Sequence, residues 1–188
     1  MHKYLLFILF SFATIDCFPQ AVLRLKDRVR AVEEIQKDRL ENLLPQLMKR
    51  EKIECWVIIT REYNEDPIIK SLLPPTWLNA RRRTILVFTL EESSNKVDMA
   101  AITRYSFGNL IKSVWDKEKE PDQMKALVDY LKLKNPKKIG INVSNTYGIA
   151  DGLSVTDHEL LMNYLPSSLK SRVVSSEPLA VSWVETRT

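Results

Sequence analysis

The sequence predicts an α/β domain in which a mixed sheet of about five to six strands is flanked by helices. Short β-branched and apolar runs, bounded by charged or turn residues, alternate with longer segments of helical periodicity. Strands that alternate with helices are typical of a sheet covered by helices. The chain has no internal repeats and no low-complexity tract, and we expect one folded domain over residues 21–176.

The first residues have the composition of a secretory signal peptide. Lys3 gives a short basic region, and the apolar stretch over residues 5–15 is too short to span a bilayer comfortably. We expect a signal peptide over residues 1–18, cleaved near Phe18, and lipidation at Cys17 stays open as the alternative. The chain is therefore expected to be exported, to a periplasmic or extracellular location. No other apolar run is long enough for a stable membrane span.

The rest of the chain, about 170 residues, is long enough to bury a core. If Cys17 leaves with the signal, Cys55 is alone, and its apolar neighbours favour a small buried hydrophobe. Export without disulfides suits a bacterial periplasm or surface. The net charge is +4, from 28 basic and 24 acidic residues with interspersed signs. This pattern is typical of a solvated surface and does not predict a nucleic-acid partner.

The first half of the chain is expected to form a long helix followed by strands. Apolar residues recur at helical spacing over residues 27–51. Pro45 lies within that pattern and should kink or restart the helix, because it removes one hydrogen bond and clashes with the preceding turn. Turn-forming residues follow over 61–75. Strands are expected at residues 56–60, 84–90 and 98–105.

The second half is expected to alternate two helices with two strands. One helix starts at Pro121 and ends at Asn135, before a proline. The other is capped by Ser154 or Thr156 and ends before Pro166. The strands are predicted at residues 138–143 and 172–175, with a glycine-containing loop at 148–152.

The final segment, residues 177–188, also begins as a helix. Ser176 can cap it, and Val181, Trp183 and Val184 form its apolar side. We expect this helix to start a linker to a further domain that this chain does not contain. Its apolar side would then lack a partner within the chain.

The sequence offers few residues for catalysis. The four glycines form neither a dinucleotide-binding motif nor a phosphate-binding loop. One histidine, His158, remains after the signal, so the usual zinc sites lack ligands. A Ser-His-Asp arrangement would have to use His158. Its neighbours Asp157 and Glu159 are better explained as acidic charge at the positive end of a helix dipole. Asn142 begins a match to a glycosylation acceptor pattern, which occurs frequently by chance.

The densest polar cluster, at residues 61–67, directly follows an apolar strand. Ligands commonly bind at strand-end loops of α/β sheets, so Arg61, Tyr63 and Asn64 are candidate binding residues, together with Trp77 further along. A packed structural turn is the alternative for Trp77. Three arginines follow at positions 81, 82 and 83, either as a basic loop before a strand or as a contact for an anion or carboxylate.

Several of these segments resemble the N-terminal domain of bacterial exported Xaa-Pro aminopeptidase-like proteins, a domain of the creatinase/prolidase type. The resemblance covers about residues 30–188, and its matches occur in the same order along the chain. The matching segments are Arg61-Glu62-Tyr63-Asn64-Glu65-Asp66-Pro67, Pro75-Thr76-Trp77-Leu78, Ala80-Arg81-Arg82-Arg83-Thr84, Ile139-Gly140-Ile141-Asn142-Val143-Ser144, Ala150-Asp151-Gly152-Leu153 and Trp183-Val184-Glu185-Thr186-Arg187-Thr188.

The resemblance implies a catalytic partner outside this chain. In such proteins a peptidase domain of the pita-bread fold follows, and two Asp, one His and two Glu in it bind two divalent metal ions. This chain would then hold no catalytic residue, metal ligand or cofactor. Its domain would pack on the catalytic half, contribute to a homo-oligomer, and narrow the entrance so that short peptides are preferred. Arg61, Tyr63, Asn64 and Trp77 would lie at that rim.

Three functions remain open from the sequence. The first is the accessory, non-catalytic domain of a metallopeptidase. The second is a stand-alone exported binding or scaffold module that keeps the fold without peptidase activity. The third is an independent hydrolase that uses His158.

Overall fold

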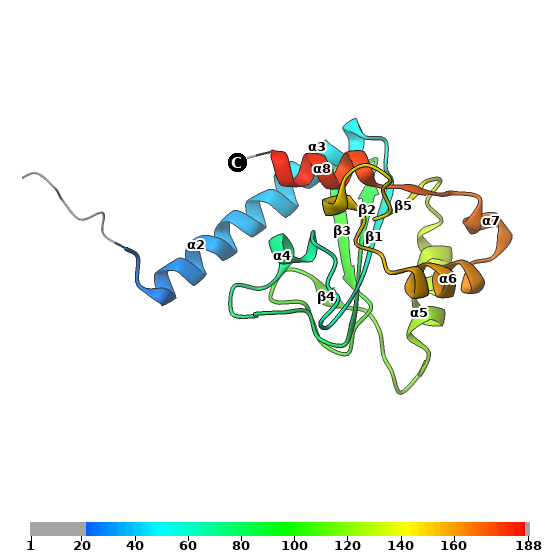
Figure 1. The fold of residues 1–188 in the computed structure, drawn as a ribbon, viewed down its shortest axis with the longest axis horizontal. Helices are drawn as coiled ribbons and strands as arrows, with labels where there is room; N and C mark the ends of the chain where they lie inside the picture. Colours follow the sequence, from blue (N-terminus) through cyan, green and yellow to red (C-terminus); the bar gives the residue numbers. More distant parts are fainter. Residues whose placement is uncertain (1–21, 187–188) are drawn as a thin grey trace, which may run out of the picture.

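The computed structural model describes residues 22–186 and contains a six-stranded mixed sheet with helices on both faces (Figure 1). The strand order is β4-β3-β2-β1-β5-β6. The pairs β1–β2 and β2–β3 are antiparallel, and β3–β4, β1–β5 and β5–β6 are parallel. The predicted α/β class with a mixed sheet is confirmed. The strands are β1 (Cys55–Arg61), β2 (Arg83–Glu91), β3 (Lys96–Ala101), β4 (Lys112–Ser113), β5 (Ile139–Ile141) and β6 (Val173–Ser175).

The predicted long N-terminal helix restarts at Pro45, as expected. Pro45 lies in the first turn of α3, where its missing N–H needs no partner, and a π-helical turn directly precedes it. The first part of this long helix, α2, projects away from the body of the domain (Figure 1). The helices are α2 (Leu25–Asp38), the π turn (Arg39–Leu43), α3 (Leu44–Arg50), α4 (Ile69–Leu72), α5 (Gln123–Lys134), α6 (Val155–Tyr164), α7 (Ser167–Lys170) and α8 (Glu177–Glu185), with a 3₁₀ turn at Gly148–Ala150.

Side chains alternate along β1 between two apolar cores, one on each face of the sheet. Trp56 and Ile58 belong to the core that includes residues of α3, α4 and α8. Cys55, Val57 and Ile59 belong to the core that includes residues of α5, α6 and α7. Both faces of the strand are therefore buried, which explains its uninterrupted apolar sequence. Cys55 is buried as predicted, and burial raises the pKa of its thiol to about 12.

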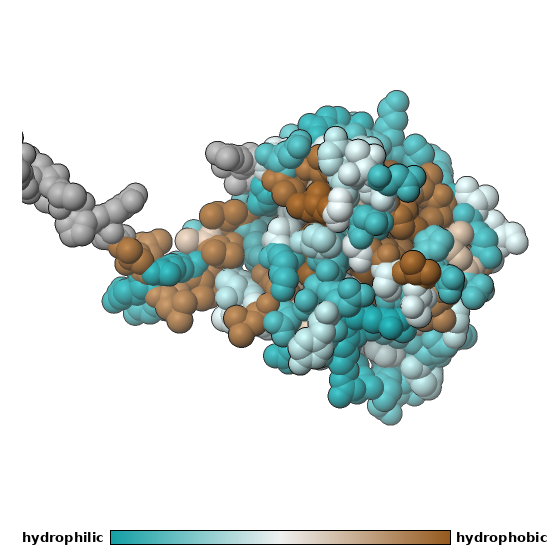
Figure 2. All heavy atoms as spheres, in the orientation of Figure 1, coloured by the Kyte–Doolittle hydropathy of each residue, from teal (hydrophilic) through white to brown (hydrophobic). Residues whose placement is uncertain are grey.

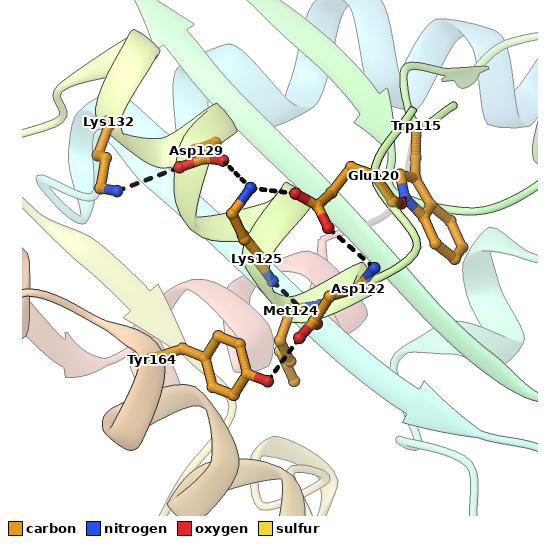
Figure 3. A network of polar contacts seen from close by, with 8 residues as sticks. All are labelled: Trp115, Glu120, Asp122, Met124, Lys125, Asp129, Lys132 and Tyr164. Carbon is orange, nitrogen blue, oxygen red and sulfur yellow. Dashed lines mark hydrogen bonds and ion pairs between the residues drawn. The ribbon is translucent and has the colours of Figure 1, made fainter. Parts of the chain in front are cut away.

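Two of the helices on the second face, α5 and α6, are joined through the N-terminus of α5. The Asp122 carboxylate accepts hydrogen bonds from the backbone N–H groups of Met124 and Lys125 at 2.9 and 3.2 Å. Tyr164, at the end of α6, donates to the other carboxylate oxygen at 2.6 Å (Figure 3). One carboxylate thus caps α5 and holds α6 beside it. The helix begins two residues after Pro121, because Asp122 acts as the cap.

Some elements differ from their predicted positions. Strand β3 ends at Ala101 and not at Tyr105, and the Thr103 hydroxyl donates to the Tyr105 carbonyl, which turns the chain there. Ser154, one of the two alternatives, caps α6. The short elements α4, β4 and α7 were not predicted, because two to four residues are too few to show a period.

The expectation that the last helix lacks a partner in this domain is wrong. Trp183 of α8 is only 1% exposed and packs edge-on against Trp56, with ring centroids 6.4 Å apart. Its indole N–H donates to the Ser71 hydroxyl at 2.7 Å, and the Arg39 guanidinium lies 4.4 Å from its ring centroid. Val184 remains exposed on the outer side. The apolar face of a helix can be recognised in a sequence, but the sequence does not show what that face packs against. The face of α8 packs against the core of its own domain.

The predicted signal peptide at residues 1–18, with the lipidation alternative at Cys17, lies outside the described residues. Among residues 22–186, no helix combines the length and apolarity that crossing a membrane requires.

Candidate functional site

The turn after β1 places three of the predicted site residues at one end of the sheet. Arg61 is paired with Arg83 across β1 and β2. The backbone N–H of Asn64 donates to the Arg61 carbonyl at 3.0 Å and closes a tight turn. Tyr63 lies within this turn in a left-handed conformation, with φ of 67°, and is 89% exposed. The turn therefore presents Tyr63 and Asn64 to solvent.

Arg61 itself is engaged with α6. Its Nη2 donates to Oδ1 of Asp157 at 2.7 Å, and its Nε lies 2.7 Å from Oδ2. Nε of Arg83 lies 3.2 Å from the same carboxylate, which is almost fully buried and also accepts from the Ser154 hydroxyl at 2.9 Å. The hydrogen bond to Asp157 raises the pKa of the Arg61 guanidinium. The two arginines and Asp157 thus fasten α6 to the sheet.

A groove with a volume of about 640 Å³ lies beside this turn. Its aromatic wall is Trp77, which packs edge-to-face on Tyr105 and Phe107 with centroid separations of 5.8 and 5.2 Å. The guanidinium of Arg81 lies 4.8 Å from the Trp77 centroid and 5.6 Å from the Tyr105 centroid. The groove is lined by Glu62, Thr76, Trp77, Leu78, Asn79, Arg81, Arg82, Arg104 and Tyr105.

The groove is positively charged. Its ionic residues are Arg81, Arg82 and Arg104 against the single acid Glu62. Among residues 22–186, no carboxylate lies within 4 Å of a guanidinium nitrogen of these three arginines. Burial raises the pKa of Tyr105, so its phenol stays a neutral hydrogen-bond donor at ordinary pH. Guanidinium groups without protein carboxylates, next to aromatic rings, suit a planar anion such as a carboxylate.

The rim of the groove is held by backbone contacts between two turns. The N–H of Glu62 donates to the Arg82 carbonyl at 2.6 Å, and the Arg82 N–H donates to the Glu62 carboxylate at 3.1 Å. Arg82 is left-handed, with φ of 49°, as is Tyr63 in the adjacent turn. Left-handed residues other than glycine are uncommon, and they cluster at ligand-binding segments.

The structure brings together only part of the predicted site. Trp77 lines the groove, whereas Arg61, Tyr63 and Asn64 do not, although Glu62 from the same turn does. The structure divides the arginine triplet: Arg81 and Arg82 line the groove, and Arg83 begins β2 with its Nε 3.2 Å from the Asp157 carboxylate. A contact of Arg81 or Arg82 with an anion stays a prediction.

Arg104 and Tyr105 were missed because they were assigned to strand β3. Arg104 and Tyr105 are polar residues that come after the apolar run of β3. This change in polarity could have indicated that the strand ends before them.

A second polar cluster is buried between the sheet and α8. Asp66 accepts hydrogen bonds from the Asn142 amide and from the Ile68 N–H, both at 2.8 Å. The Asn142 side-chain oxygen accepts from the Trp56 indole at 2.7 Å and from the Ser176 hydroxyl at 2.6 Å. Asn142 is 1% exposed, so the glycosylation acceptor pattern is inaccessible in the folded domain. The cluster is satisfied internally and serves to join loops to the core.

Asp66 should make stability fall as pH rises from about 4 to about 6. Burial raises the pKa of its carboxyl to about 6, against the opposing effect of the hydrogen bonds from Asn142 and Ile68. Between these pH values the Asp66 carboxyl keeps its proton in the native state and loses it in the unfolded state. Its ionisation therefore lowers the free energy of unfolding by roughly 3 kcal/mol at pH 7. Urea unfolding across this pH range should show Asp66→Asn gaining stability relative to the wild type by that amount. Parallel pH profiles would contradict the prediction.

The described residues contain no obvious metal centre. Among residues 22–186, no group of three or more His, Cys, Asp or Glu side chains is arranged to hold a metal ion. His158 lies in the first turn of α6, and its backbone N–H donates to the Ser154 carbonyl at 2.9 Å.

Comparisons of the chain with protein-family models, with curated proteins and with solved structures found no match.

Proposed function

We propose that this chain is the non-catalytic N-terminal domain of a Xaa-Pro aminopeptidase-like metallopeptidase, and that its groove binds the carboxylate end of short peptides. One observation carries the proposal: Arg81, Arg82 and Arg104 surround an aromatic groove without a carboxylate partner among the described residues. Three of the segments that resemble this family, at residues 61–67, 75–78 and 80–84, contribute to the same groove.

The chemistry of the groove supports binding and not hydrolysis. Guanidinium groups form paired, charge-assisted hydrogen bonds to a carboxylate, and the rings of Trp77 and Tyr105 can pack against an apolar side chain such as a proline ring. A volume of about 640 Å³ lies within the range of small-molecule sites. In this proposal the catalytic residues and two divalent metal ions belong to the C-terminal domain. Tyr63 and Asn64, exposed beside the groove, face that domain and narrow its entrance.

A stand-alone exported binding or scaffold module is the second candidate. The packing of α8 favours it, because Trp183 is buried in the core of this domain and not in an interface with another domain. The two candidates are distinguished by the reading frame downstream of Thr188. A frame that encodes the two Asp, one His and two Glu of a two-metal site supports the first candidate, and a stop codon with no peptidase half encoded nearby supports the second.

Calorimetric titration with short proline-containing peptides tests the groove. The chain should bind a tripeptide with a free carboxylate at least about tenfold more tightly than its C-terminal amide, because a hydrogen bond to a charged group contributes about 1.5–3 kcal/mol. Arg81→Gln and Arg104→Gln should each remove most of that difference. Arg50→Gln is the matched control, since Arg50 is exposed on α3 and does not line the groove.

Two results would overturn the proposal. The first is equal affinity for the acid and the amide in the wild type and both groove variants. The second is metal-dependent hydrolysis of the peptide by the purified chain, lost in His158→Ala, which would show that the domain is itself catalytic.

A further inference from the structure

A second groove, here called the base groove, lies between α2 and the loop that follows α4 and has a volume of about 600 Å³. Val32 and Ile35 contribute to it from α2, and Leu73 and Pro75 contribute from the loop. Val32 and Ile35 are 39% and 51% exposed. Hydrophobic atoms are visible along α2 and at its base (Figure 2). The described part of the chain therefore leaves an apolar surface uncovered here.

The base groove is continuous with the arginine-lined groove, the candidate site to which Arg81, Arg82 and Arg104 contribute. Trp77 and Leu78 line both grooves. Leu78 is 89% exposed, so its side chain is available to a ligand. A molecule that contacts Trp77 and Leu78 thus reaches both grooves. The two volumes, about 640 and about 600 Å³, together hold a longer ligand than either groove holds alone.

The charges of the two grooves indicate what kind of ligand fits both. Among the described residues, the base groove is lined by no acid and by two charged side chains, Arg39 and Lys70. Arg39 donates to the Thr186 carbonyl at 2.6 Å, and Nζ of Lys70 lies 3.7 Å from the Glu65 carboxylate. The arginine-lined groove attracts an anion, whereas the base groove suits an uncharged apolar group. The combined surface therefore fits a ligand with one anionic end and an apolar portion beyond it.

We propose that the two grooves form one continuous binding site for peptides in which apolar residues precede the carboxylate end. The terminal carboxylate binds in the arginine-lined groove, and the peptide passes over Trp77 and Leu78. An apolar side chain further from the carboxylate then packs against Val32 and Ile35 of α2. The inference rests on the proposed function, because the carboxylate contact decides which end of the peptide enters which groove. It adds a preference for apolar residues that the arginines do not provide.

Calorimetric titration of the full chain with extended peptides tests the inference. The tripeptide Gly-Gly-Pro is extended at its amino end by two leucines or by two serines. The leucine-extended peptide should bind about tenfold more tightly, because the base groove removes its apolar side chains from water.

Variants of two exposed residues show whether the base groove causes this preference. Ile35→Ser should remove most of it, because the substitution takes an apolar side chain out of the base groove. Leu133→Ser is the matched control and should keep the preference, since Leu133 is 79% exposed on α5 and lines neither groove. No residue of α2 is buried, so the circular dichroism of Ile35→Ser should match that of the wild type. A leucine preference that survives Ile35→Ser overturns the inference.

Peptide amides separate the inference from the proposed function. If the tripeptide acid binds more tightly than its amide, but the leucine- and serine-extended peptides bind equally, the proposed function stands and the continuous site is refuted. A leucine-extended peptide whose acid and amide bind equally also refutes the continuous site, because its carboxylate then lies outside the arginine-lined groove. Equal affinity of acid and amide at both lengths refutes the proposed function and the inference together.

Sedimentation velocity tests the other possible occupant, a second copy of this chain. The wild type with saturating leucine-extended peptide should show no dimer that depends on Ile35. A dimer that Ile35→Ser breaks and the peptide does not would show that a second copy covers the base groove, and this result would overturn the inference.

Discussion

Replacing Trp183 with alanine should destabilise the domain by about 3–5 kcal/mol, the usual cost of removing a large aromatic side chain from a core. Trp183 fills the space between α8 and Trp56 and donates a hydrogen bond to Ser71. The truncation leaves a cavity, removes the hydrogen bond that the Ser71 hydroxyl accepts, and leaves the Arg39 guanidinium without its aromatic neighbour. Chemical denaturation followed by far-ultraviolet circular dichroism measures the loss.

The matched control for this substitution is on the same helix. Val184 is 43% exposed, so Val184→Ala should cost less than about 1 kcal/mol. A loss of that small size for Trp183→Ala as well would show that α8 is peripheral to the core, and would return it to the role of a linker helix.

Gly152→Ala should lower the free energy of unfolding by about 3 kcal/mol, although it adds only one methyl group. A Cβ at this position would overlap the carboxyl group of Asp66. That carboxyl is held in place by Asn142 and Ile68, so displacing it both strains the loop and leaves buried donors unpaired. Gly148→Ala is the matched control, because a Cβ at Gly148 meets no atom within 4 Å.

A double-mutant cycle identifies the cause of the Gly152 effect. Asp66→Ala removes the carboxyl group that the new methyl group would meet, so adding Gly152→Ala to it should cost little more. Urea midpoints of the four proteins give the coupling energy. Additive losses, with no coupling, would place the strain in the backbone and refute the steric explanation.

The sequence was sufficient to predict five of the six strands and the longer helices. The apolar run at Trp56 and the helical period around Pro45 are long enough to fix an element and its restart. Tertiary contacts decided the rest. The apolar face of α8 packs against residues more than a hundred positions away in the sequence, which no local pattern reveals.

The sequence predicted where the candidate site lies, but only some of the residues that form it. A polar cluster after an apolar strand indicated the end of the sheet at which the groove lies, and Trp77 lines that groove. Arg61 was predicted as a binding residue because it lies in the same polar cluster as Tyr63. Its guanidinium is bound to the Asp157 carboxylate, which is 96 residues away, so the sequence could not show this pairing. Arg104 completes the groove only because β3 ends before it.

The strands at the two edges of the sheet limit how other chains can attach. Strand β4 has two residues, one of them the charged Lys112, and β6 has three. An incoming strand would find few free backbone groups there, and a lysine at an edge further opposes edge-to-edge addition. The domain is therefore protected against growth into an extended sheet at high concentration. Any contact with another chain is expected to use side chains and not a strand added at an edge of the sheet.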